Sequence, residues 1–147
     1  MPTPHEVRLA CKKALAEDKF RPIGGMTFCN QALLYILDEL EIPFPYNKKS
    51  PPLANIIYDI VSKSRDWVCV DAELAFENSK DGGVSLALQR NEGGNGHCVV
   101  MYPEQEMVFS CKWQKKVGFC LNVGKTNGIM SINFAFSKEP EYFVYGK

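Results

Sequence analysis

The feature that most constrains this chain is a change of hydrophobic period at Asp81-Gly82-Gly83. Before it, apolar residues recur at helical spacing, as in residues 7–16. After it, they form strand-like runs such as His97–Tyr102, and residues 91–96 (Asn-Glu-Gly-Gly-Asn-Gly) give a strong turn signal. The pattern predicts an α+β fold in which N-terminal helices pack on a C-terminal antiparallel β-sheet.

Each half divides into short elements with their own start and stop signals. Thr3-Pro4 is a favourable helix opening, and Asp71 is a favourable N-cap. The predicted helices are 4–16, 28–41, 53–62 and 72–78. The predicted strands are 67–70, 84–88, 97–102, 107–113, 117–123, 129–136 and 142–145. With no visible repeat or linker, residues 1–147 are expected to form a single domain.

Charge and hydropathy exclude several classes of partner. The chain has 17 basic and 17 acidic residues, so it has no basic field to hold nucleic acid. No apolar run approaches the roughly 18 residues that span a bilayer. Residues 1–6 lack a basic region followed by an apolar stretch, which predicts synthesis in the cytoplasm without a signal peptide. Delivery to the periplasm or cell wall would then need a secretion machine or lysis.

The cysteines do not suggest a disulfide framework or a metal site. There are six of them, at positions 11, 29, 69, 98, 111 and 120, but no Cys-x-x-Cys motif and only two histidines. A structural zinc site is therefore disfavoured, and neither a metal nor a cofactor is expected. Cys69, Cys98 and Cys111 lie in apolar, strand-like runs and are expected to fill the core.

Cys29 has a different setting, because it follows a glycine-containing loop and lies in the first turn of a predicted helix. Thr27 is the predicted N-cap of that helix. Free backbone N–H groups and the positive end of the helix dipole lower the pKa of a thiol there and can stabilise an oxyanion. Cys29 is thus a candidate nucleophile, and the alternative is a small buried residue at a helix start.

A cysteine nucleophile needs a base, and only two histidines are available. His5 falls in the first turn of the first predicted helix, where a solvent-exposed role is expected. His97 begins an apolar strand directly after the glycine-rich turn, next to a flexible approach. His97 is therefore the candidate base, and a structural histidine in a hairpin is the alternative.

Two segments carry a resemblance to a known family: Thr27-Phe28-Cys29-Asn30 and Gly96-His97-Cys98-Val99-Val100-Met101. With the order of elements around them, they resemble papain-like cell-wall cysteine hydrolases, the NlpC-type peptidases and CHAP amidases. The resemblance runs from about Thr27 to the C-terminus and implies a papain-like arrangement of the helices and sheet. In that family, cysteine attacks an amide of peptidoglycan, histidine is the base, and a third polar residue orients the imidazole.

The resemblance implies that the third residue lies on a strand after the histidine strand. Asn122 is the first choice, because a polar residue inside an apolar run must find a partner. Ser110 is the second choice, and a turn-forming role before Gly124 is the alternative for Asn122. Candidates for the oxyanion site or substrate cleft are Thr27, Phe28, Asn30 and Ser110.

The resulting expectation is a cysteine peptidase or amidase that cleaves an amide bond in peptidoglycan through Cys29 and His97. A phage lysin or a secreted antibacterial effector would fit, and an effector would have an immunity protein as a further partner. Two alternatives stay open. One is a papain-like hydrolase or acyltransferase that acts on a protein or a small acyl substrate, and the other is a binding module without catalysis. Which peptidoglycan bond is cut is also left open.

Overall fold

The computed structural model describes residues 1–146. Its helices are α1 (Pro4–Ala16), the 3₁₀-helix η1 (Asp18–Phe20), α2 (Cys29–Glu39), α3 (Ala54–Lys63), α4 (Ala72–Lys80) and α5 (Ile132–Ala135). Its strands are β1 (Trp67–Val70), β2 (Ser85–Gln89), β3 (His97–Tyr102), β4 (Val108–Ser110), β5 (Lys115–Val117), β6 (Phe119–Asn122), β7 (Gly128–Ser131) and β8 (Glu141–Tyr145). None of the helices in this described part of the chain is long and apolar enough to cross a membrane.

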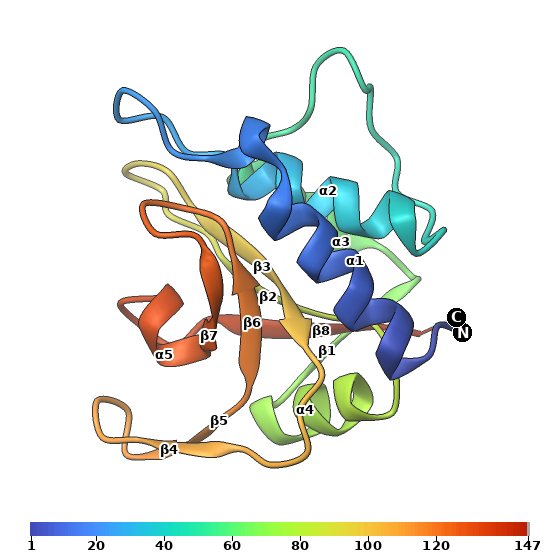
Figure 1. Cartoon of the computed structure of the whole chain (residues 1–147), viewed down its shortest axis with the longest axis vertical. Coiled ribbons are helices and arrows are strands. Elements are labelled where there is room, and N and C mark those ends of the chain that lie inside the picture. The colour runs from blue at the N-terminus through green and yellow to red at the C-terminus, as the bar shows by residue number, and fades with distance from the viewer. Residues whose placement is uncertain (147) are drawn as a thin grey trace.

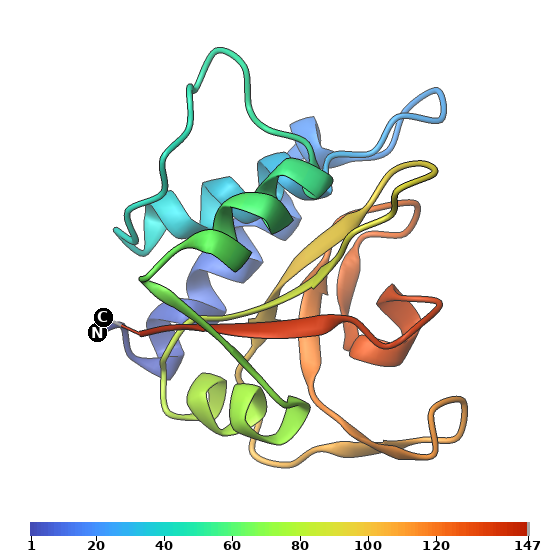
Figure 2. The same cartoon turned by 180° about the vertical axis from the view of Figure 1, so that it is seen from behind.

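Six of the strands form one antiparallel sheet in the order β1-β8-β2-β3-β6-β7. Strand β8 lies between β1 and β2 (Figure 2). It therefore pairs β1, which comes from the mainly helical first half of the chain, with the strands of the second half. β4 and β5 pair with each other in a separate hairpin. The prediction of an α+β fold with an antiparallel sheet is confirmed.

Helices lie on both faces of the sheet: α1, α2 and α3 on one face, α4 and α5 on the other (Figures 1 and 2). Strand β3 contributes side chains to the cores on both faces of the sheet. Cys98 and Val100 pack with α1–α3, whereas Val99 and Met101 pack with α4 and α5. Because both faces of the strand are covered, its sequence is continuously apolar rather than alternating.

The predicted helix signals act as expected at α1 and α4. The Thr3 hydroxyl accepts from the Glu6 N–H at 3.1 Å, and the Glu6 carboxylate accepts from the Thr3 N–H at 2.9 Å. Asp71 caps α4 by accepting from the Leu74 N–H at 2.8 Å. Gly82 has a φ of 96°, the left-handed conformation that ends a helix. These local interactions explain why both helices begin where the sequence predicted.

The strand predicted at 129–136 is wrong in its second half. β7 ends at Ser131, and the chain turns into the short helix α5. Ile132 and Phe136 are buried in the second core, the one between the sheet and helices α4 and α5, while Phe134 is 77% exposed. A strand would place all three side chains on one face, whereas a helical turn puts only the residues at i and i+4 together. Packing therefore overrides the strand pattern here.

The strands predicted at 107–113 and 117–123 also differ from the structure. The first is reduced to β4, because the Ser110 hydroxyl accepts from the Trp113 N–H at 3.2 Å and a turn follows. The second is divided at Gly118 into β5 and β6, which belong to different sheets. A Cβ on Gly118 would lie 2.8 Å from Met101 Cε, so a larger residue at this break would have to displace the end of the Met101 side chain.

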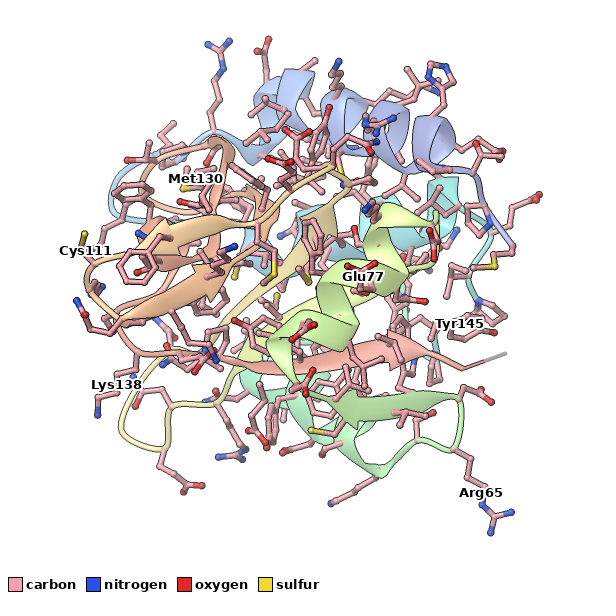
Figure 3. The ribbon with its side chains drawn as sticks, turned by 90° about the horizontal axis from the view of Figure 1, so that it is seen from below. Arg65, Glu77, Cys111, Met130, Lys138 and Tyr145 are labelled. Carbon is pink, nitrogen blue, oxygen red and sulfur yellow. The ribbon has the colours of Figure 1, made fainter. Side chains whose placement is uncertain are left out.

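The expectation that three cysteines fill the core is right only for Cys98, which is 1% exposed. Cys69 and Cys111 are exposed. Cys111 lies at the tip of the β4–β5 hairpin, at the periphery of the molecule (Figure 3). The strand-like residues around both cysteines lie in short edge elements whose outer faces meet solvent, so an apolar run there does not imply burial.

Candidate active site

Three loops meet at one end of the sheet: residues 21–27 before α2, 91–96 before β3, and 123–127 after β6 (Figures 1 and 2). Asn127 joins two of them. Its Oδ1 accepts from the Gly124 N–H at 3.0 Å, and its Nδ2 donates to the Phe20 carbonyl at 2.9 Å. The side chain of Asn127 therefore holds the β6–β7 loop against the segment that leads to α2.

Cys29 is the first residue of α2 and is partly buried. The prediction that Thr27 caps this helix is wrong: the N-cap is Phe28, and no described side chain caps the first turn. The loop turns at Gly24 and Gly25, whose φ angles are positive, and the helix begins one residue later than predicted. Thr27 is left exposed, one position too early to accept from the helix N–H groups.

His97 begins β3, and its Nε2 lies 2.6 Å from Asn122 Oδ1 at the end of β6. Asn122 Nδ2 donates to the Thr126 carbonyl at 2.7 Å, which identifies the other amide atom as the oxygen. Because a carbonyl oxygen only accepts, His97 Nε2 carries the proton in this bond. The imidazole therefore keeps Nδ1 as the nitrogen that can take a proton from Cys29.

The thiolate form of Cys29 and the protonated form of His97 stabilise each other. The pKa of Cys29 falls to about 5, first because the Cys98 thiol hydrogen-bonds to the sulfur and then because of His97, and these effects outweigh burial. Burial lowers the pKa of His97, but its interactions with Cys29 and Asn122 outweigh this and raise that pKa above its ordinary value. Near neutral pH, the arrangement favours a thiolate beside an imidazolium.

Asn55, on α3, is a positioning residue that the sequence did not single out. Its Nδ2 donates to the carbonyls of Asn91 and Gly94 at 2.9 and 3.1 Å, and its Oδ1 accepts from the Asn91 N–H at 2.9 Å. A Cβ on Gly96 would lie 2.4 Å from Asn55 Oδ1, so only glycine fits next to this clamp. The glycine-rich turn before His97 is thus held by three hydrogen bonds.

Two cavities meet at the candidate site. One, of about 530 Å³, is lined by Cys29 and Asn30 together with residues of α3 and the glycine-rich loop. The other, of about 640 Å³, is lined by His97 and Asn122 together with residues of the β6–β7 loop and α5. Gly25, Thr27 and Asn95 line both. The candidate nucleophile and base therefore lie at the junction of a divided cleft.

The remaining candidates from the sequence lie in different places. Asn30 lines the cavity beside Cys29, and its Nδ2 donates to the Pro52 carbonyl at 2.9 Å. Phe28 packs against the core and lines neither cavity. Ser110 is buried in the β4–β5 hairpin and is not brought to Cys29, because its strand leaves the main sheet. His5 is exposed on α1.

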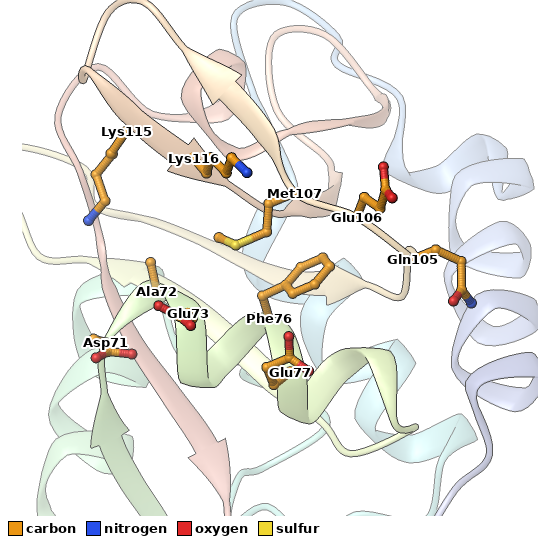
Figure 4. A pocket seen from close by; sticks show the side chains of 10 residues that line it. All are labelled: Asp71, Ala72, Glu73, Phe76, Glu77, Gln105, Glu106, Met107, Lys115 and Lys116. Atoms are coloured by element: carbon orange, nitrogen blue, oxygen red, sulfur yellow. The ribbon is translucent and has the colours of Figure 1, made fainter.

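A further cavity of about 740 Å³ lies between α4 and the β4–β5 hairpin (Figure 4), and these elements lie at the end of the molecule opposite the three loops (Figure 1). Carboxylates such as Glu73 and Glu77 face Lys115 and Lys116 across it, and neither Cys29 nor His97 reaches it. Within residues 1–146, no group of three His, Cys, Asp or Glu side chains is arranged to hold a metal ion. The chemistry of the side chains, rather than cavity size, therefore identifies the site.

We expect iodoacetamide to modify Cys29 first at pH 6. With a pKa of about 5, Cys29 is mostly thiolate at that pH, whereas a thiol of ordinary pKa is well under 1% ionised. Peptide mass spectrometry after brief labelling would measure the order of modification, with the exposed Cys111 as internal control. Equal labelling of both residues at pH 6 would contradict the thiolate assignment.

For the amide cleavage expected from the sequence, replacing Asn122 by alanine should reduce kcat/KM roughly 10- to 150-fold. This is the effect of losing one hydrogen bond to a charged group. Asn122→Asp keeps an acceptor for His97 Nε2, so it should recover part of the rate. Its carboxylate should also move the alkaline limb of the pH–rate profile upward, because it stabilises the imidazolium. An alkaline limb that stays in place would show that Asn122 does not act through His97.

The site is built from three separate parts of the chain: the start of α2, the start of β3 and the end of β6. Comparison with models of known protein families finds no match, and comparison with curated proteins finds no significant similarity. The functional assignment consequently depends on the geometry and chemistry of Cys29, His97 and Asn122.

Proposed function

We propose that this protein is a cysteine hydrolase that cleaves an amide bond in peptidoglycan, with a papain-like arrangement of its catalytic residues. The observation that carries the proposal is the placement of His97, which interacts with Cys29 and holds Asn122 Oδ1 at 2.6 Å from Nε2. Cysteine, histidine and an orienting amide are the parts of a thiol nucleophile and its base. Peptidoglycan as substrate follows from the resemblance to cell-wall hydrolases.

In the first half of the reaction, the Cys29 thiolate attacks the amide carbonyl carbon and forms a C–S bond. The carbonyl oxygen becomes an oxyanion beside the uncapped N-terminus of α2, where the backbone N–H of Cys29 can donate to it. The His97 imidazolium then gives its proton to the amide nitrogen, the C–N bond breaks, and the free amine leaves. Asn122 keeps the imidazole oriented throughout this transfer.

In the second half, neutral His97 accepts a proton from water, and the resulting hydroxide attacks the thioester carbonyl. Collapse of this second intermediate releases the carboxylic acid and returns Cys29 as a thiolate beside an imidazolium. Every proton taken from water or given to the amine passes through His97, so the cycle closes without a cofactor. The roles of acid and base alternate on one imidazole, as in other acyl-transfer sites.

The direct test is digestion of purified peptidoglycan by the full chain, followed by mass spectrometry of the soluble products. Cleavage of an amide adds one water across the bond and creates one new amine and one new carboxylic acid. Hydrolysis of a glycosidic bond would instead create a new reducing sugar. Absence of new amines with well-folded protein would overturn the proposal, and activity confined to small thioesters or a protein would favour the other cysteine hydrolases.

A further inference from the structure

The two halves of the cleft have different relations to the catalytic pair. Cys29 lines the cavity beside α3, and His97 lines the cavity beside the β6–β7 loop; neither residue lines both. During acyl transfer the acyl group stays on the sulfur, whereas the leaving nitrogen must lie next to the imidazole that protonates it. The cavity on the Cys29 side is therefore the acyl side, and the cavity on the His97 side is the amine side.

The acyl side offers apolar surface and no free charge. Met26, Leu53 and Ile56 line it and are 61%, 65% and 48% exposed. The one charged residue among its described lining residues is Arg90, whose guanidinium is engaged by Asp59 at 2.8 and 3.3 Å and by Glu92 at 2.8 Å. No carboxylate of residues 1–146 lines this cavity, so a free ammonium group next to the scissile carbonyl would find no partner among them.

Among the described residues that line the amine side, Lys125 is the one cation besides His97. Lys125 is exposed in the β6–β7 loop, lines this cavity, and forms no ion pair with any residue in the described range. The described part of the chain places no carboxylate on this side either. Lys125 follows Gly124, beside the His97 ring: a Cβ on that glycine would be 3.5 Å from His97 Cε1. An anionic group on the leaving amine would thus meet a cation close to the reacting nitrogen.

We propose that the cleft selects amides by polarity, with an uncharged acyl group on the Cys29 side and an amine that carries a carboxylate on the Lys125 side. This inference rests on the proposed function and narrows its substrate. Within peptidoglycan, the amide between the uncharged lactyl group of the sugar and the stem peptide meets both conditions. A bond that follows the acidic residue of the stem does not, because it places a carboxylate on the acyl side.

The test combines one substitution with one chemical change of the substrate. Soluble muropeptides are used with free carboxylates and after amidation by carbodiimide and ammonium chloride, which removes those charges. Initial rates of amine release give kcat and KM for wild type and for Lys125→Met. Lys116→Met is the matched control, because Lys116 lines the remote cavity and forms no ion pair within residues 1–146 (Figure 4).

We expect wild type to have an about tenfold lower kcat/KM on the amidated substrate, mainly through KM, the effect of one charge-assisted hydrogen bond. Lys125→Met should show the same about tenfold loss on the carboxylate substrate and no further loss on the amidated one. Lys116→Met should match wild type on both. The acyl products should contain no charged group next to the new carboxylic acid.

Two results would overturn the inference, and they are distinguishable. Equal wild-type rates on both substrates, or an acyl product with an adjacent charge, would reject the proposed charge preference of the two sides of the cleft. Amide hydrolysis itself would remain supported. If wild type releases no amine from the carboxylate substrate and none from the amidated substrate, the proposed function is rejected, and the inference with it.

Discussion

Replacing Cys29 by alanine is expected to lower amide cleavage by about 10⁴-fold or more, because it removes the sulfur that forms the acyl-enzyme in the proposed mechanism. The fold should persist, since Cys29 is only partly buried and loses one atom at a helix start. The measurement is the rate of amine release from peptidoglycan at pH 7, with circular dichroism to verify folding.

The matched control for this substitution is Cys111→Ala, which removes an exposed thiol at the tip of the β4–β5 hairpin. It should keep the wild-type rate, because Ser110 and the rest of that hairpin lie outside the cleft. Full activity of a folded Cys29→Ala protein would remove Cys29 from the mechanism. In that case the thiol would be a core residue of a binding module, as the alternative interpretation holds.

Replacing His97 by alanine is expected to reduce cleavage by about 10²- to 10⁴-fold, the usual contribution of a positioned acid and base. It should also raise the pKa of Cys29, because His97 supplies a hydrogen bond and a positive charge to the thiolate. Alkylation of Cys29 at pH 6 should then slow markedly. The pH dependence of the labelling rate measures this shift separately from turnover.

The wild-type pH profile follows from the same pair. Activity should rise as pH passes about 5, where Cys29 loses its proton, and fall as pH passes the raised pKa of His97, where the proton for the amine is lost. His5→Ala is the control, because His5 is exposed on α1. A His97→Ala protein whose thiol still ionises near pH 5 would show that other groups activate Cys29.

Much of the fold was predictable because its signals are local. The capping box at Thr3 and Glu6 and the N-cap at Asp71 act within one helical turn, and the bounds of β3 match the predicted 97–102. The failures occur where tertiary contacts compete with local pattern. Burial of Ile132 in the core beneath α4 and α5 favours the short helix α5 over the predicted strand. At Gly118, one predicted strand is divided between two sheets.

The sequence by itself determined that Cys29 lies in the first turn of a helix and that His97 begins a strand after a flexible turn, because neighbouring residues decide both. Tertiary structure alone decided which polar group reaches the imidazole. Pairing of β3 with β6 sets Val100 opposite Leu121, and this register carries Asn122 to His97 and leaves Ser110 in another sheet. Strand register depends on which faces of the paired strands are buried and on the turns that connect them, so the sequence of β6 alone does not determine it.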